Sequence, residues 1–61
     1  MSGREVLRRL KAEGWELRRV AGSHHIMEKD GRKVPVPMHG AQDIPAGTLA
    51  AIQRQTGVKL K

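Results

Sequence analysis

The Asp30-Gly31 pair constrains the fold of this chain more than any other feature of its sequence. It separates two stretches that are typical of short strands, His24 to Lys29 and Arg32 to Met38. An Asp-Gly pair in this position is the strongest short-range signal for a β-hairpin with a two-residue turn. Such a turn determines which residues face one another. Here it places Glu28 opposite Lys33, and this pair of opposite charges supports the register.

The register divides the hairpin side chains between two faces, because successive side chains of a strand point to opposite sides. One face is largely apolar and should pack against helices; it carries His25, Met27, Val34, Val36 and Met38. The other should be more open; it carries His24, Ile26, Glu28, Lys33, Pro35 and Pro37. We therefore predict that His25 is a half-buried packing residue and that His24 points outward, opposite Pro37. Because proline cannot donate to a ladder, Pro35 and Pro37 indicate an edge strand.

A first helix is predicted from Gly3 to Glu13. Ser2 and Glu5 have the spacing of a capping box, in which each side chain bonds the backbone of the other residue. Gly14 is suited to the position just past the helix end. A basic stripe along this helix, Arg4, Arg8 and Lys11, is interpreted as an ordinary solvated face.

A second helix is predicted after the connection that ends at Ile44. Asp43 is its predicted N-cap, and Pro45 suits its first turn. Apolar anchors follow at helical spacing in Leu49 and Ile52. Gly57 is the predicted stop, after which Val58 should fold back onto the helix.

A remaining strand is predicted from Trp15 to Val20, so that the order is α-β-β-β-α. The fold class is α+β: a three-stranded antiparallel meander whose single apolar face is covered by both helices. The turn at residues 21–23 leaves two alternatives open. A three-residue loop puts Trp15 and Leu17 on the core face and Arg18 and Val20 on the His24 face, whereas a two-residue turn reverses both assignments.

Size and charge narrow the function classes. A chain of 61 residues predicts one domain over 1–61 with a small core. Twelve Lys and Arg against six Asp and Glu give a net charge of +6, which favours a nucleic-acid partner over a charge that only keeps the chain soluble. Trp15 is the sole aromatic residue, so base stacking on several rings is excluded and the phosphate backbone must dominate RNA binding.

The same composition excludes other classes. The sequence has no cysteine, which removes disulfides and thiolate metal sites. No apolar run approaches the ~20 residues of a membrane span, and the N-terminal stretch lacks the apolar segment of a signal peptide. We therefore expect a cytoplasmic protein that neither enters a membrane nor binds its surface.

Metal chemistry is also not expected. His24 and His25 point to opposite faces and cannot easily share an ion, and no paired carboxylates have the spacing of a nuclease metal site. No cofactor is predicted, and no Gly-rich phosphate loop or nucleophile elbow is present.

Acid–base chemistry without a metal is what remains. Histidine exchanges a proton near neutral pH, so an outward His24 could take the proton of a ribose 2′-hydroxyl that attacks the adjacent phosphorus. A cation would stabilise the charge that develops on the phosphoryl oxygens. The candidates are Lys33 on the same face, Arg18, and Lys29 and Arg32 at the hairpin tip. The alternative reading of His24 is an ordinary surface residue.

Two residues beside this region are further candidates. His39 follows the third strand, near the end at which His24 faces Pro37, and would serve as partner acid or phosphate donor; the alternative is a polar loop residue. Ser23 would orient His24 or cap the turn, and the turn role is preferred.

The sequence resembles the HicA family of toxins from HicA–HicB toxin–antitoxin systems. The resemblance runs from "SGREVLRRLKAEGW" through "GSHHIM" and "DGRKVPVPMHG" to "DIPAGTLAAIQRQTGV". It implies a fold like the double-stranded RNA-binding domain, an mRNA interferase that needs no metal, and a HicB-like antitoxin partner that blocks the active site. The catalytic histidine of the family matches His24. One departure is the short tail after "QTGV", where family members often continue with acidic and hydrophobic residues.

Two other functions stay open. The first is a non-catalytic RNA-binding module of similar fold, which would bind duplex RNA in a strongly salt-dependent way without cleaving it. The second is a small interaction protein whose basic face docks an acidic partner.

Overall fold

The computed structural model describes residues 1–60 and contains the predicted sequence of elements. They are α1 (Gly3–Ala12), β1 (Glu16–Ala21), β2 (His24–Lys29), β3 (Arg32–Pro37) and α2 (Ala46–Thr56). The α-β-β-β-α order and the α+β class are thus confirmed. The single domain over 1–61 stays a prediction, and its last residue, Lys61, lies outside the described residues.

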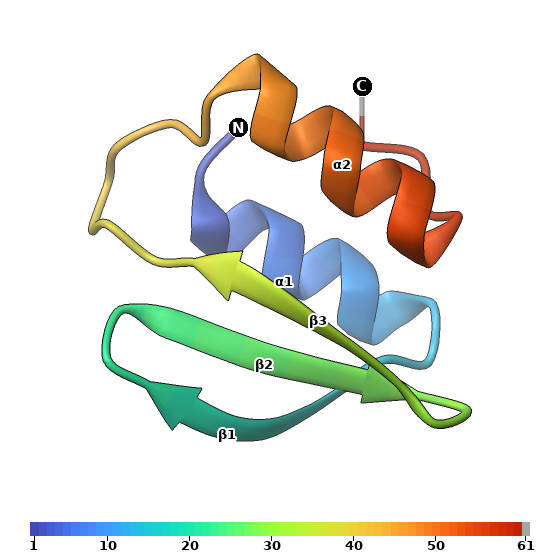
Figure 1. The fold of residues 1–61 in the computed structure, drawn as a ribbon. Helices are drawn as coiled ribbons and strands as arrows, with labels where there is room; N and C mark the ends of the chain where they lie inside the picture. The colour runs from blue at the N-terminus through green and yellow to red at the C-terminus, as the bar shows by residue number, and fades with distance from the viewer. Residues whose placement is uncertain (61) are drawn as a thin grey trace.

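The sheet is an antiparallel meander with the strand order β1-β2-β3 (Figure 1). A turn of Asp30 and Gly31 joins β2 to β3, and both residues have positive φ, 52° and 81°. The predicted register is confirmed at every pair, from Lys29 opposite Arg32 to His24 opposite Pro37. The bounds of β2 are the predicted ones, whereas β1 lies one residue later than predicted and β3 ends one residue early. The Met38 N–H still donates to the Ser23 carbonyl at 2.7 Å.

The positions of the prolines follow from this register. Opposed residues in an antiparallel pair alternate between hydrogen-bonded and non-hydrogen-bonded pairs, and a two-residue turn makes the closing pair a hydrogen-bonded one. Lys33, Pro35 and Pro37 therefore direct their backbone groups away from β2, to the outer edge of β3. Two of these three positions lack an N–H, so the predicted edge strand is confirmed.

The core lies between one face of the sheet and the two helices, which cover the same side (Figure 1). From the sheet it takes Met27, Val34 and Val36, all 2% exposed or less. The helices and connections contribute the other buried apolar residues: Val6, Leu7, Leu10, Trp15, Ile44, Leu49, Ile52 and Leu60. The predicted apolar face of the hairpin is thus the buried one.

The N-terminal cap of α1 forms only in part. The Ser2 hydroxyl accepts the Glu5 N–H at 3.2 Å, as predicted. The return bond from Glu5 does not form, because its carboxylate pairs with Arg8 and, at 4.0 Å, with Arg9. The helix ends one residue before the predicted Glu13.

Of the two alternatives for the turn before β2, the structure has the two-residue turn. Ala21 pairs with His24, so the turn has two residues, and Val20 lies opposite His25 rather than on the His24 face. The register then shifts between Leu17 and Arg19, which is a β-bulge. Because the bulge adds one residue to β1, Leu17 lies opposite Met27 and on the same face of the sheet. Trp15, two residues earlier, is part of the core and is 4% exposed.

The bulge also explains the position of Arg18. Its Nε lies 2.6 Å from an Oε1 of Glu28, which belongs to the His24 face of β2. Arg18 therefore lies on the His24 face, as the three-residue-loop alternative had it, although the reason is the bulge and not such a loop.

The start of α2 differs from the prediction. Its N-cap is Pro45, with no side-chain hydrogen bond, and not Asp43. Asp43 instead forms a bridge with Ser2, and its carboxylate lies 3.3 Å from the amino group of Met1. The Ile44 N–H donates to the Met1 carbonyl at 2.8 Å. These contacts hold the connection before α2 against the start of α1.

The end of α2 follows the prediction and adds one residue to the core. Gly57 is the left-handed C-cap, and its N–H donates to the Gln53 carbonyl at 2.8 Å. Val58 packs against the core, as predicted. Leu60 is only 2% exposed, and its N–H donates to the Gln53 side-chain oxygen at 2.9 Å.

Gly3 is the position at which the helix–sheet packing can be tested. A Cβ there would press against the Pro37 carbonyl oxygen and the Met38 sulfur. We expect Gly3→Ala to destabilise the fold by about 1–3 kcal/mol, as overpacked sites do. In a domain of this size the midpoint of thermal unfolding falls by about 4–8 °C per kcal/mol, which circular dichroism would measure.

The matched control is Gly47→Ala in α2, where an added Cβ meets nothing within 4 Å. Alanine is the better helix former, so this variant should be neutral or more stable by up to about 1 kcal/mol. Equal destabilisation by both substitutions would contradict the tight contact at Gly3.

Candidate active site

His24 begins β2, directly after the turn of Gly22 and Ser23, and its side chain is exposed. It lies opposite Pro37, at the end of β3 from which the chain leaves the sheet. The outward orientation predicted for His24 is therefore the observed one.

His39 comes two residues after the end of β3 and is also exposed. Its carbonyl accepts the Gln42 N–H at 3.1 Å, which closes a turn in the connection to α2. The bond from Met38 N–H to Ser23 O joins the residues that directly precede the two histidines. The backbone thus holds His24 and His39 at the same corner of the sheet.

Both histidines line one open groove of about 430 Å³, which we call the His24 groove. The prolines of β3 form one wall, and the connection and the start of α2 form the other. Its lining residues are His24, Pro35, Pro37, His39, Gln42, Asp43, Pro45 and Thr48. Two imidazoles in one groove can provide a base and an acid, so the geometry is suited to a proton-transfer reaction.

His25 is in a different environment from its neighbour. It is half-buried, on the core side of β2, and faces Val36. Its Nδ1 is buried without a hydrogen-bond partner among residues 1–60. The predicted packing role fits this environment.

The comparisons with known proteins give a consistent result. The family model described as HicA toxin of bacterial toxin–antitoxin systems matches residues 3–58. The chain belongs to the HicA toxin family. A relative from Pseudomonas fluorescens (strain Pf0-1), named probable mRNA interferase HicA, is 36% identical over 55 residues, which cover 90% of this chain and 92% of the relative.

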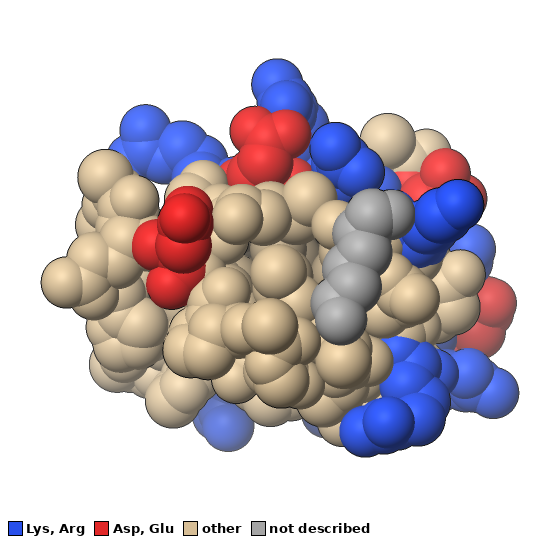
Figure 2. All heavy atoms as spheres, turned by 90° about the horizontal axis from the view of Figure 1, so that it is seen from above, with Lys and Arg blue, Asp and Glu red and all other residues tan. Residues whose placement is uncertain are grey.

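Within residues 1–60 of this HicA-family chain, no lysine or arginine lines the His24 groove. Figure 2 shows that the face seen from above is mostly uncharged, with Lys and Arg gathered at its margins. The helix on that side, α2, contains a single charged residue, Arg54. The four cations predicted to stabilise charge, Lys33, Arg18, Lys29 and Arg32, are therefore absent from the lining of the groove that holds the two histidines.

Two predicted charge-stabilising residues lie on the His24 face but near the other end of the strands. Lys33 is exposed and opposite Glu28, and Arg18 is paired with the same Glu28. A strand rises about 3.4 Å per residue, and Lys33 lies opposite Glu28, so its backbone is about 14 Å along the sheet from His24.

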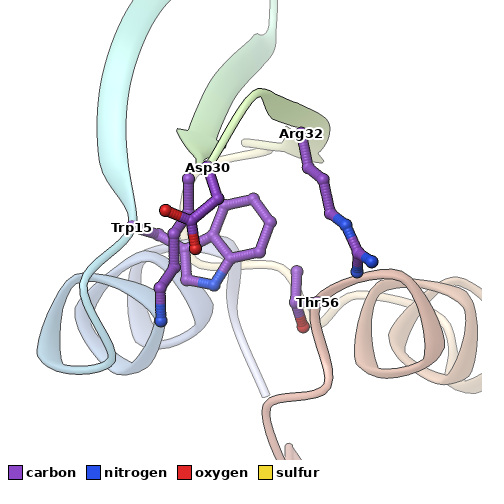
Figure 3. Close-up of a pocket in the computed structure, with 5 residues that line it drawn as sticks. Trp15, Asp30, Arg32 and Thr56 are labelled. Atoms are coloured by element: carbon purple, nitrogen blue, oxygen red, sulfur yellow. The ribbon is translucent and has the colours of Figure 1, made fainter.

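Lys29 and Arg32 close the β2–β3 hairpin at the end of the sheet opposite His24. The five steps along β2 from His24 to Lys29 span about 17 Å. Both cations line a separate cleft with Trp15, Asp30 and Thr56, which we call the Trp15 cleft (Figure 3). The structure therefore does not bring them to the histidines.

Ser23 and Arg4 complete the surroundings. The Ser23 carbonyl accepts the Met38 N–H, which fits the preferred turn role, and its side chain is exposed. Arg4 lines a hollow with Ser2, Gly40 and Ala41, beside the connection that carries His39. Sequence reasoning missed Arg4 because the packing of α1 against the end of β3 cannot be seen in the order of residues.

Residues 1–60 contain neither a cluster of metal-binding side chains nor a helix that could span a membrane. No group of three or more His, Cys, Asp or Glu in this part of the chain could hold a metal ion. None of its helices is long and apolar enough to cross a membrane.

Chemical modification can test the exposure of the three histidines. Diethyl pyrocarbonate acylates accessible imidazole nitrogens. We expect His24 and His39 to react faster than His25, because they are exposed whereas His25 is half-buried with its Nδ1 enclosed. Peptide mass spectrometry over time would measure the three rates, and a His25 that reacts fastest would contradict the assignment of the faces.

Proposed function

We propose that this chain is the toxin of a type II HicA–HicB pair and a metal-independent endoribonuclease that cuts mRNA, with His24 as general base. The observation that carries the proposal is the exposed His24 in one groove with His39, in a chain that belongs to the HicA toxin family. The name of the relative, an mRNA interferase, supports the same activity.

The reaction follows from the two imidazoles. His24 takes the proton of a ribose 2′-hydroxyl, and the 2′-oxygen forms a bond to the adjacent phosphorus. The bond from phosphorus to the 5′-oxygen breaks, and His39 gives that oxygen a proton. The products are a 2′,3′-cyclic phosphate and a 5′-hydroxyl. DNA is not a substrate of this reaction, because it lacks the attacking hydroxyl.

Negative charge develops on the phosphoryl oxygens during this step and needs a nearby donor. Lys33 and Arg18 lie on the His24 face, but Arg18 is engaged by Glu28. Arg4 borders the connection that carries His39, so we add it to these candidates. Ser23 supports the backbone at His24 and is given no chemical role.

A HicB-like antitoxin is the proposed protein partner, and the cytoplasm is the proposed location. The His24 groove is open, so a protein that covers it would exclude RNA from both histidines. The net charge of +6 favours a partner that presents acidic side chains. Antitoxin binding and RNA cleavage should therefore be mutually exclusive.

The central test is His24→Ala, assayed on labelled RNA in the presence of a metal chelator. Loss of a positioned base typically costs roughly 10²–10⁴-fold in rate, and we expect a loss of that size. His39→Ala should also slow cleavage. An unchanged cleavage rate in His24→Ala would exclude His24 as the catalyst.

The matched control is His25→Leu, which changes the adjacent histidine on the other face. Because the Nδ1 of His25 has no partner, an apolar replacement leaves no new buried group unpaired. We expect this variant to remain folded and to cleave RNA at close to the wild-type rate. A substrate with a 2′-deoxyribose at the cleaved nucleotide should resist every variant.

The same assay separates the alternative, a non-catalytic RNA-binding module. That reading is supported by the charge of the chain and by a His24 groove that no Lys or Arg of the described part of the chain lines. It predicts RNA binding with intact RNA after long incubation of the wild-type protein.

A further inference from the structure

The Trp15 cleft, at the hairpin end of the sheet, has the composition of an anion site. Its volume is about 330 Å³, and it lies about 17 Å along β2 from the backbone of His24. Figure 3 shows Arg32 extending from β3 toward the Thr56 side of the cleft, opposite Trp15 and Asp30. The cleft plays no part in the reaction proposed for the two histidines.

Trp15 provides the first argument. It is only 4% exposed, yet none of the hydrogen bonds among residues 1–60 uses its indole N–H. An indole nitrogen is a donor and never an acceptor. The indole nitrogen is not one of the enclosed polar atoms that lack a partner among residues 1–60, so this donor is open to the cleft that Trp15 lines. A ligand with an acceptor oxygen in the cleft could accept this N–H.

The charges provide the second argument. The Lys29 Nζ uses one N–H on the Glu13 carbonyl, at 2.7 Å, and has two others. Arg32 is exposed and forms no ion pair within residues 1–60. Asp30 opposes them with one carboxylate, which leaves a net charge of +1. Thr56 is already engaged, because its hydroxyl donates to Ile52 O and accepts from Val58 N–H.

The position of the cleft provides the third argument. Arg32 and Thr56 line it, whereas Pro37 and Thr48 line the His24 groove. The two sites therefore lie at opposite ends of the same pair of elements, β3 and α2 (Figure 1). One extended polyanion along these elements could reach both.

We propose that the Trp15 cleft binds a backbone phosphate of the RNA strand whose cleaved bond lies in the His24 groove. A nucleotide of a stacked strand advances ~3.4 Å, so the two phosphates are about five nucleotides apart. This inference rests on the proposed ribonuclease function. It assigns to Lys29 and Arg32 a role in holding the RNA and not in stabilising the reacting phosphate.

The test compares RNAs of two lengths, each with a 2′-deoxyribose at the cleaved position so that binding is measured without cleavage. One extends about two nucleotides on each side of that position and the other about eight, since the cleft should be reached after about five. On the long RNA, Arg32→Ala should lose affinity on the order of tenfold. Its salt dependence, log K against log salt, should be shallower by about 0.7.

Two controls identify the site. On the short RNA, Arg32→Ala should bind as wild type does. Arg8→Ala removes the same kind of charge from α1, outside both sites, and should not distinguish the two lengths. The single tryptophan gives one indole N–H resonance in NMR, which the long RNA should shift and the short RNA should leave in place. Trp15→Phe should weaken binding of the long RNA only.

Each other outcome overturns the inference. If Arg32→Ala binds both RNAs more weakly by the same factor, or binds both as wild type does, a distant phosphate subsite is excluded. A Glu-rich peptide or inorganic phosphate that shifts the indole resonance while long RNA does not would assign the cleft to an acidic protein or a free anion. If wild type cleaves no RNA, the proposed function fails; if it cleaves and Arg32→Ala binds normally, only the subsite fails.

Discussion

The two-residue turn of Asp30 and Gly31 is the constraint on which the core and the candidate active site both depend. Its two positive φ angles join β2 to β3 in a single register. That register buries Met27 and leaves His24 in the open. A slip of one residue would move every side chain of a strand to the other face, so it would bury His24 and expose Met27. The hydrophobic core thus stabilises the same register that exposes the histidine.

Local signals made much of the fold predictable. The Asp30-Gly31 turn, the alternation of side chains in the hairpin and the bond from Glu5 N–H to the Ser2 hydroxyl each depend on residues close together in the chain, and each was confirmed. The failures involve contacts between distant residues. Asp43 has the spacing of an N-cap, yet it contacts Ser2 and Met1 at the other end of the sequence. The burial of Leu60, whose backbone N–H donates to the Gln53 side chain, was not predicted. No residue type in β1 indicates that a bulge forms at Arg18.

The candidate active site was predictable to a similar depth. Register alone placed His24 outward and near His39, and both line one groove. The strand register did not show which cations lie near the two histidines, because the sequence gives the charge of a side chain but not its position in the fold. In the structure Lys29 and Arg32 lie at the far end of the sheet, while Arg4 lies beside the His39 connection. The two histidines and the pair of Lys29 and Arg32 thus lie on different parts of a very small surface.

The prolines of β3 have a consequence for association as well. Pro35 and Pro37 remove two of the three N–H groups that the outer edge of β3 would offer to another strand. Among residues 1–60, the outer edge of β1 is the one that keeps all its N–H groups, and a bulge interrupts that strand. Two copies joined edge to edge through β1 would present only the two depleted β3 edges to a third. The residues that form the wall of the groove therefore also disfavour growth into a fibre.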